Sequence, residues 1–143
     1  MKNLMLIMGL FFLTLGTIQG QTVLGKWKTI DDETGEAKSV VEIYEKSGKV
    51  YGKVVDILRA KHKKDVCTKC EGAEKNKQIL GMVIINGLKK EDSDYSGGTI
   101  LDPTNGKKYK CSISLESPDK LKLRGYIGFS MIGKTQYWVR VKK

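Results

Sequence analysis

After Gln21 the sequence consists mainly of short runs in which every second residue is apolar. The clearest run covers residues 108–116, where Tyr109, Cys111, Ile113 and Leu115 alternate with lysine, serine and glutamate. A period of two is typical of a β-strand that buries one face and exposes the other. No segment of about ten residues in this part has a convincing helical period of apolar residues. The pattern therefore predicts an all-β fold.

Eight such runs follow one another, and residues that favour turns separate most of them. The runs cover residues 24–30, 38–45, 49–58, 82–88, 95–101, 108–116, 120–127 and 135–141. Asn105-Gly106 is a strong turn signal, and Gly97-Gly98 indicates a bulge or sharp bend within a strand. Consecutive strands joined by tight turns favour an up-and-down order, which closes most simply into a barrel without exposed edges. We expect residues 21–143 to form one eight-stranded antiparallel barrel, with an interior that side chains fill or that holds one small ligand.

Residues 1–20 have the pattern of a secretory signal peptide. Met1-Lys2-Asn3 supplies a basic start, residues 4–15 are almost entirely apolar, and Gly20 precedes the polar Gln21 at the expected cleavage point. A membrane anchor would need a longer apolar run, of about 20 residues. No cysteine directly follows the run to accept a lipid. We therefore predict an exported protein, periplasmic or secreted, with no transmembrane span in its mature form.

The sequence is strongly basic, with 26 lysine and arginine residues against 16 acidic residues. A basic exported protein is attracted to anionic envelope surfaces, whereas export makes nucleic acid an unsuitable partner. The densest basic cluster is Arg59, Lys61, Lys63 and Lys64, in the long irregular segment 59–76. Such a cluster either remains solvated or contacts an anionic surface.

Three readings are open for Cys67 and Cys70, which are separated by two residues. A redox pair would need a helix N-terminus to lower the pKa of its first thiol, and zinc would need four ligands. A disulfide suits an oxidising compartment and is the reading that we favour, with no metal bound. Cys111 lies on the apolar face of its strand, which predicts a buried free thiol. Its pairing with either loop cysteine stays open, which leaves three candidate bridges.

Several motifs together resemble known barrels. Gly25-Lys26-Trp27 resembles the Gly-x-Trp signature of lipocalins, and Arg140 resembles the arginine that packs over that tryptophan at the closed end. The longer set of matching segments is 41–44, 48–54, 67–70, 98–103, 105–107, 109–111, 121–126, Gly128 and 135–140. In this order the segments resemble the bacterial exported family known as domain of unknown function 2147. The resemblance implies a lipocalin-like barrel in the envelope of Gram-negative bacteria, without an established activity.

The candidate ligand contacts are aromatic and arginine residues on the strands. They are Trp27, Tyr109, Arg124, Tyr126, Trp138 and Arg140. We expect Trp27 to be a core plug with Arg140 stacked on it. Arg124 lies in the polar register of its strand, where it is either an outward charge or an anchor for an anionic group. The alternation leaves open whether Trp138 and Arg140, or Tyr137 and Val139, face inward.

No group of residues indicates catalysis. No pair of carboxylates has a spacing that requires acid–base work, and His62, the only histidine, stands among lysines without an adjacent nucleophile. We therefore expect neither enzymatic activity nor a cofactor. The leading hypothesis is a protein that binds a small apolar or amphipathic ligand. The alternative is an envelope interaction module that docks through its basic surface and has a filled core.

Overall fold

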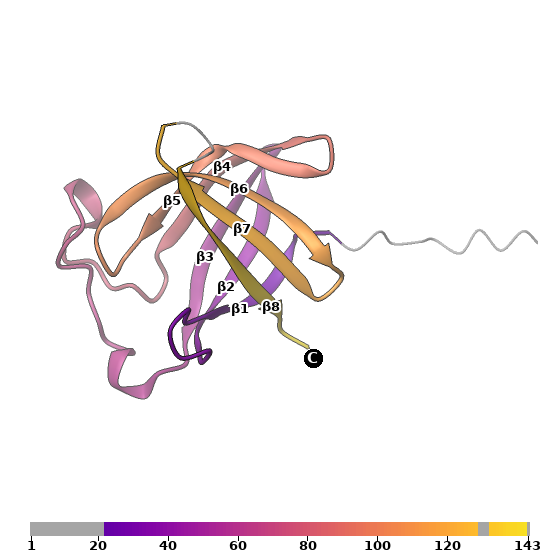
Figure 1. Ribbon diagram of the computed structural model, residues 1–143. Helices are drawn as coiled ribbons and strands as arrows, with labels where there is room; N and C mark the ends of the chain where they lie inside the picture. The colour runs from indigo at the N-terminus through magenta and orange to yellow at the C-terminus, as the bar shows by residue number, and fades with distance from the viewer. Residues whose placement is uncertain (1–21, 129–131, 143) are drawn as a thin grey trace, which may run out of the picture.

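The computed structural model describes residues 22–128 and 132–142 (Figure 1). The signal peptide expected over residues 1–20 lies outside the described residues and stays a prediction. Neither of the two short 3₁₀ helices in the described part is long or apolar enough to span a membrane.

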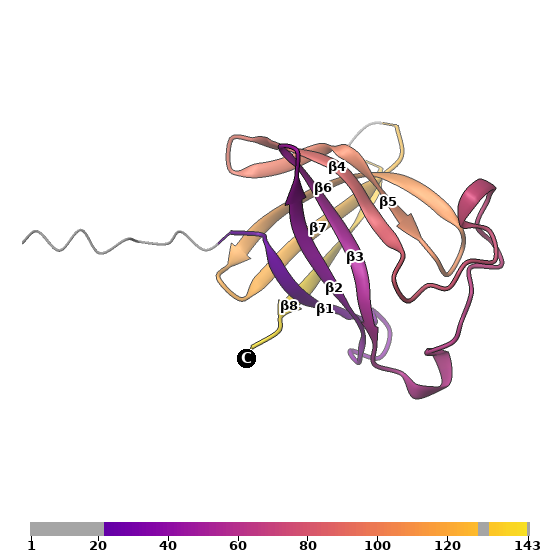
Figure 2. The same ribbon diagram turned by 180° about the vertical axis from the view of Figure 1, so that it is seen from behind.

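Eight antiparallel strands form one closed barrel in which each strand pairs with its neighbours in the sequence and β1 pairs with β8. The strands are β1 (Gly25–Ile30), β2 (Ala37–Lys46), β3 (Lys49–Ile57), β4 (Val83–Glu91), β5 (Asp94–Asp102), β6 (Lys107–Ser117), β7 (Lys120–Tyr126) and β8 (Gly133–Arg140). The predicted all-β, up-and-down barrel is therefore confirmed. Figures 1 and 2 show the strands wrapped around a common interior from opposite sides.

The alternation in the sequence becomes the alternation between inside and outside. On β6, Cys111 and Ile113 are buried while Lys108 and Lys110 are exposed, as a two-residue period requires. The pairing of β5 with β6 shifts register between Tyr95 and Gly98. This irregularity confirms the bend that the paired glycines predicted.

One half of the barrel is solid. Its core contains Trp27 on β1, Val41 and Ile43 on β2, and Ile113 and Leu121 on β6 and β7, all almost completely buried. The chain enters the barrel at this end (Figure 1). Because an up-and-down barrel alternates the direction of its strands, the β1–β2, β3–β4, β5–β6 and β7–β8 connections all lie at the other end.

The solid end is closed by the predicted contact between Trp27 and Arg140. The Arg140 guanidinium lies 4.2 Å from the centre of the Trp27 ring, and Trp27 Nε1 donates a hydrogen bond to the Val23 carbonyl at 2.9 Å. Arg140 also donates to the carbonyls of Thr22, Leu24 and Pro118 at 2.7, 3.0 and 2.9 Å. One side chain therefore ties the N-terminal segment, the β6–β7 turn and β8 together. The expected stacking is confirmed.

The long β3–β4 connection contains η1 (Ala60–His62), η2 (Gly72–Glu74) and a disulfide between Cys67 and Cys70. The disulfide reading of this pair is confirmed, and Cys111 is the buried free cysteine. Both bridged cysteines are buried, and Cys67 Sγ lies 3.5 Å from the Pro103 carbonyl in the β5–β6 turn. The disulfide therefore shapes a loop that packs against the neighbouring turn, both at the open end of the barrel.

Candidate functional site

A cavity of about 860 Å³ occupies the half of the barrel away from Trp27. Its floor and walls are strand residues, and its rim is formed by the β3–β4, β5–β6 and β7–β8 connections. Cavities that hold small molecules have volumes of about 300–1,000 Å³. The barrel interior is thus neither wholly filled nor wholly open, because side chains fill one half and leave a ligand-sized space in the other.

The wall formed by β3, β4 and β5 is apolar. Its lining residues are Val54 and Ile57 from β3, Ile84 from β4, and Ile100 and Leu101 from β5. These are branched side chains, which pack well on a pleated strand and present only hydrocarbon to the cavity. This wall can remove the apolar part of a ligand from water.

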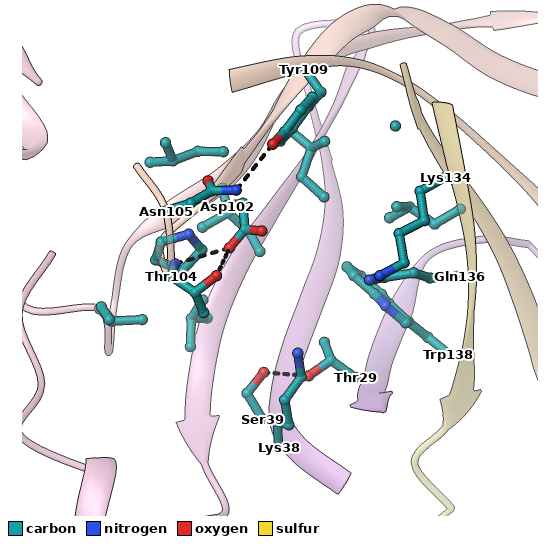
Figure 3. A pocket seen from close by; sticks show the side chains of 18 of the residues that line it. Thr29, Lys38, Ser39, Asp102, Thr104, Asn105, Tyr109, Lys134, Gln136 and Trp138 are labelled. Atoms are coloured by element: carbon teal, nitrogen blue, oxygen red, sulfur yellow. Dashed lines mark hydrogen bonds between the residues drawn. The ribbon is translucent and has the colours of Figure 1, made fainter. Parts of the chain in front are cut away.

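The wall formed by β8, β1 and β2, which are adjacent in the barrel, is polar. Lys134, Gln136 and Trp138 alternate along β8 from the rim to the floor. Thr29 on β1 and Ser39 on β2 continue this wall, with their hydroxyl oxygens 2.6 Å apart (Figure 3). Polar groups therefore continue to the bottom of the cavity on this side instead of being confined to its mouth.

Trp138 occupies the floor of the polar wall. It is 2% exposed, and its Nε1 has no hydrogen-bond partner among residues 22–128 and 132–142. In Figure 3 its ring projects from β8 into the space that the labelled residues surround. A buried donor without an acceptor is costly, so this atom is an unusual feature of the described core.

Two aspartates of the β1–β2 connection tie the mouth of the cavity together. Asp31 pairs with Arg59 from the β3–β4 connection at 2.8 Å. Asp32 pairs with Lys134 of β8 at 2.8 Å and accepts a hydrogen bond from Gln136 at 3.1 Å. The hydrogen bonds from Lys134 to Asp32 and the attraction between their charges lower the pKa of Asp32 and raise that of Lys134.

The Asp31–Arg59 pair predicts a defined acid dependence of stability. The hydrogen bond from Arg59, with those from the amides of Glu33 and Thr34, lowers the pKa of Asp31 from 3.8 to about 2. The stabilisation is therefore complete above pH 3.8 and is lost as the pH falls toward 2. We expect Asp31→Asn to lower the melting temperature at neutral pH, and the difference from wild type to shrink across this window.

Melting curves followed by circular dichroism at a series of pH values would measure this difference. Asp56→Asn is the control, because Asp56 is an exposed carboxylate on β3. A difference between wild type and Asp31→Asn that is constant from neutral pH to pH 2 would contradict the assignment.

The structure brings only some of the predicted ligand contacts to the cavity. Tyr109, Tyr126 and Trp138 line it, and Asn105 Nδ2 donates a hydrogen bond to the Tyr109 hydroxyl at 3.0 Å. Trp27 and Arg140 belong to the closed end instead. Arg124 does not line the cavity, and it donates to Thr135 Oγ1 at 3.1 Å. Of the predicted contacts, three therefore lie in the candidate site and three lie elsewhere.

Sequence reasoning missed the polar wall. Thr29, Lys38, Ser39, Lys134 and Gln136 were not among the expected contacts, although all of them line the cavity. The signal that could have found them is the alternation of Lys134 and Gln136 with Trp138. That register becomes informative only once Arg140 is known to cover Trp27, because this contact decides which face of β8 is inward.

The basic cluster divides into two parts. Arg59 lines the cavity and is paired with Asp31, whereas Lys61, Lys63 and Lys64 are exposed on and after η1. His62 Nδ1 lies 2.7 Å from the Asp65 carboxylate. Contact of the exposed lysines with an anionic surface stays a prediction.

Two other kinds of site, a metal site and a reactive thiol, have little support in the described residues. They contain no group of three or more His, Cys, Asp or Glu side chains arranged to hold a metal ion. Burial raises the pKa of the Cys111 thiol to about 12, so at neutral pH this thiol is protonated and a poor nucleophile.

A closed eight-stranded barrel, with an arginine over a tryptophan at one end and a cavity at the other, is a lipocalin-like fold. Residues 25–140 match the family model described as "Uncharacterized protein conserved in bacteria (DUF2147)", and the chain therefore belongs to this family. The family resemblance of the sequence is thus confirmed.

Comparison with solved structures supports the same fold. The structure described as "Protein HP1028 from the human pathogen Helicobacter pylori belongs to the lipocalin family" is similar, with a TM-score of 0.73 and 23% sequence identity. The match covers 83% of this chain and 82% of that one. At this level of identity the likeness concerns the fold. No curated protein matches the sequence.

Proposed function

We propose that this protein binds a small apolar or amphipathic molecule in the open half of its barrel, in the periplasm or outside the cell. The single observation that carries the proposal is the cavity of about 860 Å³ with one apolar and one polar wall. An amphipathic molecule matches such a lining on both sides, whereas a wholly apolar molecule would leave the polar wall without partners.

The construction of the barrel supports binding within it. The Trp27–Arg140 contact closes the far end, so a ligand has one route of entry, between the connections at the rim. The envelope-module alternative began from a filled core, which the cavity does not support. Exposed lysines near the rim would still attract the barrel to an anionic surface that holds such ligands.

Export is supported by the apolar N-terminal segment and by the disulfide. The Cys67–Cys70 bridge belongs to an oxidising compartment, since thiols in the cytosol are kept reduced. An exported barrel would meet its ligand among molecules of the bacterial envelope or its surroundings.

Binding can be tested with N-phenyl-1-naphthylamine, an apolar probe that becomes strongly fluorescent on leaving water. The chain is first unfolded, extracted of bound lipid and refolded. We expect the wild-type protein to increase the fluorescence of the probe and Gly125→Phe to abolish most of the increase. A side chain at Gly125 would enter the cavity, where an added Cβ meets Tyr109 and Ile100 only at 3.6 and 3.7 Å.

The control is Lys122→Phe, which adds the same ring on the same strand in the outward register between Leu121 and Leu123. It should bind the probe like wild type. The proposal fails if the wild-type protein does not increase the fluorescence of the probe, or if Gly125→Phe binds the probe as wild type does. Circular dichroism would verify that both variants fold.

A further inference from the structure

Trp138 is the one residue in the described part of the chain with a buried side-chain nitrogen or oxygen that has no hydrogen-bond partner. The other tryptophan provides a direct comparison, because Trp27 Nε1 donates to the Val23 carbonyl at 2.9 Å. A lipocalin-like barrel can therefore satisfy an indole in its core, yet the indole that lines the cavity is left without an acceptor. The Trp138 donor is therefore available to a molecule that enters the cavity.

The neighbouring polar groups are already engaged with one another. Lys134 and Gln136 both bind Asp32, and the Thr29 and Ser39 hydroxyls bind each other. Among the buried side-chain donors of this wall, Trp138 Nε1 is the one that these contacts leave without an acceptor in the described part of the chain. A ligand group that reaches this position must supply an oxygen with a free lone pair.

The charges of the polar wall favour a negative oxygen. Lys134 is balanced by its ion pair with Asp32 and also interacts with the charges of Asp102 and Glu33, whereas Lys38 forms no ion pair within residues 22–128 and 132–142. The carboxylates of the lining itself, Asp65 and Asp102, come from the β3–β4 connection and the end of β5, across the mouth from β8. An N–H donor on the same partly desolvated wall as a lysine without an ion pair binds a carboxylate more strongly than a neutral acceptor.

We infer that the cavity takes an amphipathic carboxylate, whose oxygen accepts a hydrogen bond from Trp138 Nε1 and whose hydrocarbon part lies on the β3–β5 wall. This inference rests on the proposed function and adds the chemical class and orientation of the ligand. Because Trp138 is 2% exposed, the oxygen reaches its nitrogen only when side chains nearer the mouth move. The next side chains toward the mouth on the inward face of β8 are Gln136 and then Lys134, both of which contact Asp32.

Nuclear magnetic resonance of the two indole N–H groups tests the contact directly. The chain has two tryptophans, so ¹⁵N-labelled protein gives two indole signals. We expect dodecanoate to move the Trp138 signal downfield and to leave the Trp27 signal in place. Dodecyltrimethylammonium has the same chain and a positive head, and we expect it to bind more weakly and to leave both signals unmoved.

The matched variants are Trp138→Phe, which keeps a ring but removes the donor, and Tyr137→Phe on the outward face of β8. Trp138→Phe should weaken dodecanoate binding by about tenfold or more, the value of a hydrogen bond to a charged acceptor. Its affinity for N-phenyl-1-naphthylamine, which has no oxygen, should be unchanged. Tyr137→Phe should bind both molecules like wild type.

Three results would overturn the inference while leaving the proposed function intact, provided that the naphthylamine probe still binds. They are a Trp138 indole signal that does not move, an unchanged affinity of Trp138→Phe for dodecanoate, and equal affinities for the anionic and cationic amphiphiles. Failure of both dodecanoate and the naphthylamine probe to bind would remove the proposed function itself. If Trp138→Phe does not fold, the wild-type indole signals, assigned with Trp27→Phe, still decide the question.

Discussion

Replacing Trp27 with alanine is expected to lower the free energy of unfolding by about 3–5 kcal/mol. The side chain is fully buried, so its removal leaves a large void in the solid half of the barrel. The loss would also leave the Arg140 guanidinium without the ring that it covers. Urea denaturation followed by circular dichroism would measure the change.

Tyr137→Ala is the control for Trp27→Ala. Tyr137 is a large aromatic residue on β8, but it is 41% exposed and contacts Lys120 on the outer surface. Its removal should cost about 1 kcal/mol or less. Equal losses for the two variants would show that Trp27 does not hold the closed end. Loss of ligand binding by Trp27→Ala at temperatures where it remains folded would indicate that packing in the solid half of the barrel determines the shape of the cavity in the open half.

Gly106→Ala is expected to cost about 2 kcal/mol or more and to detach the disulfide-containing loop from the barrel. Gly106 has a φ of +73°, and an added Cβ would overlap the Lys69 carbonyl and lie 2.7 Å from the Cys70 amide nitrogen. These are backbone atoms of a segment that the disulfide constrains, so they cannot turn aside as a flexible side chain would. We expect faster cleavage by trypsin between residues 59 and 81.

Gly48→Ala separates the backbone strain at a positive φ from the overlap with the disulfide loop as causes of the lost stability. Gly48 also has a positive φ, of +78°, but an added Cβ there meets nothing within 4 Å. Its replacement should therefore cost only the backbone strain, about 1 kcal/mol, and leave the trypsin pattern unchanged. If both variants lose the same stability and show the same cleavage, contact between the β5–β6 turn and the disulfide loop is unimportant.

The strands could be predicted from the sequence because each one carries its own two-residue pattern. Residues 108–116 show this most clearly, since the predicted inward residues Cys111 and Ile113 are the buried ones. Closure of the sheet into a barrel could also be predicted from the two-residue pattern, because a chain of neighbouring strands with one apolar face has few other ways to bury that face. Turn chemistry correctly placed the bend at Gly97-Gly98.

The candidate site was only partly predictable, because it depends on how strands far apart in the sequence meet. Lys134 and Gln136 are ordinary polar residues in sequence, and they become cavity groups only because Asp32 of another connection binds them. Arg124 had the charge expected of a ligand anchor, but it does not line the cavity and donates to Thr135 Oγ1 on β8 instead. The volume of the cavity depends on the side chains of several strands together, which no single run of residues encodes.

The join between the first and last strands has a consequence for how the chain reaches its native state. Two residue pairs join β1 and β8, Trp27 with Arg140 and Lys28 with Val139, and the Val141 amide donates to the Lys26 carbonyl beside them, whereas seven residue pairs join β7 and β8. The two halves of this seam are separated by nearly the entire domain, so its contacts carry the largest loop-closure entropy in the protein. We therefore expect the sheet to assemble first as an open ribbon and to become a cylinder late, when Arg140 reaches the N-terminal segment.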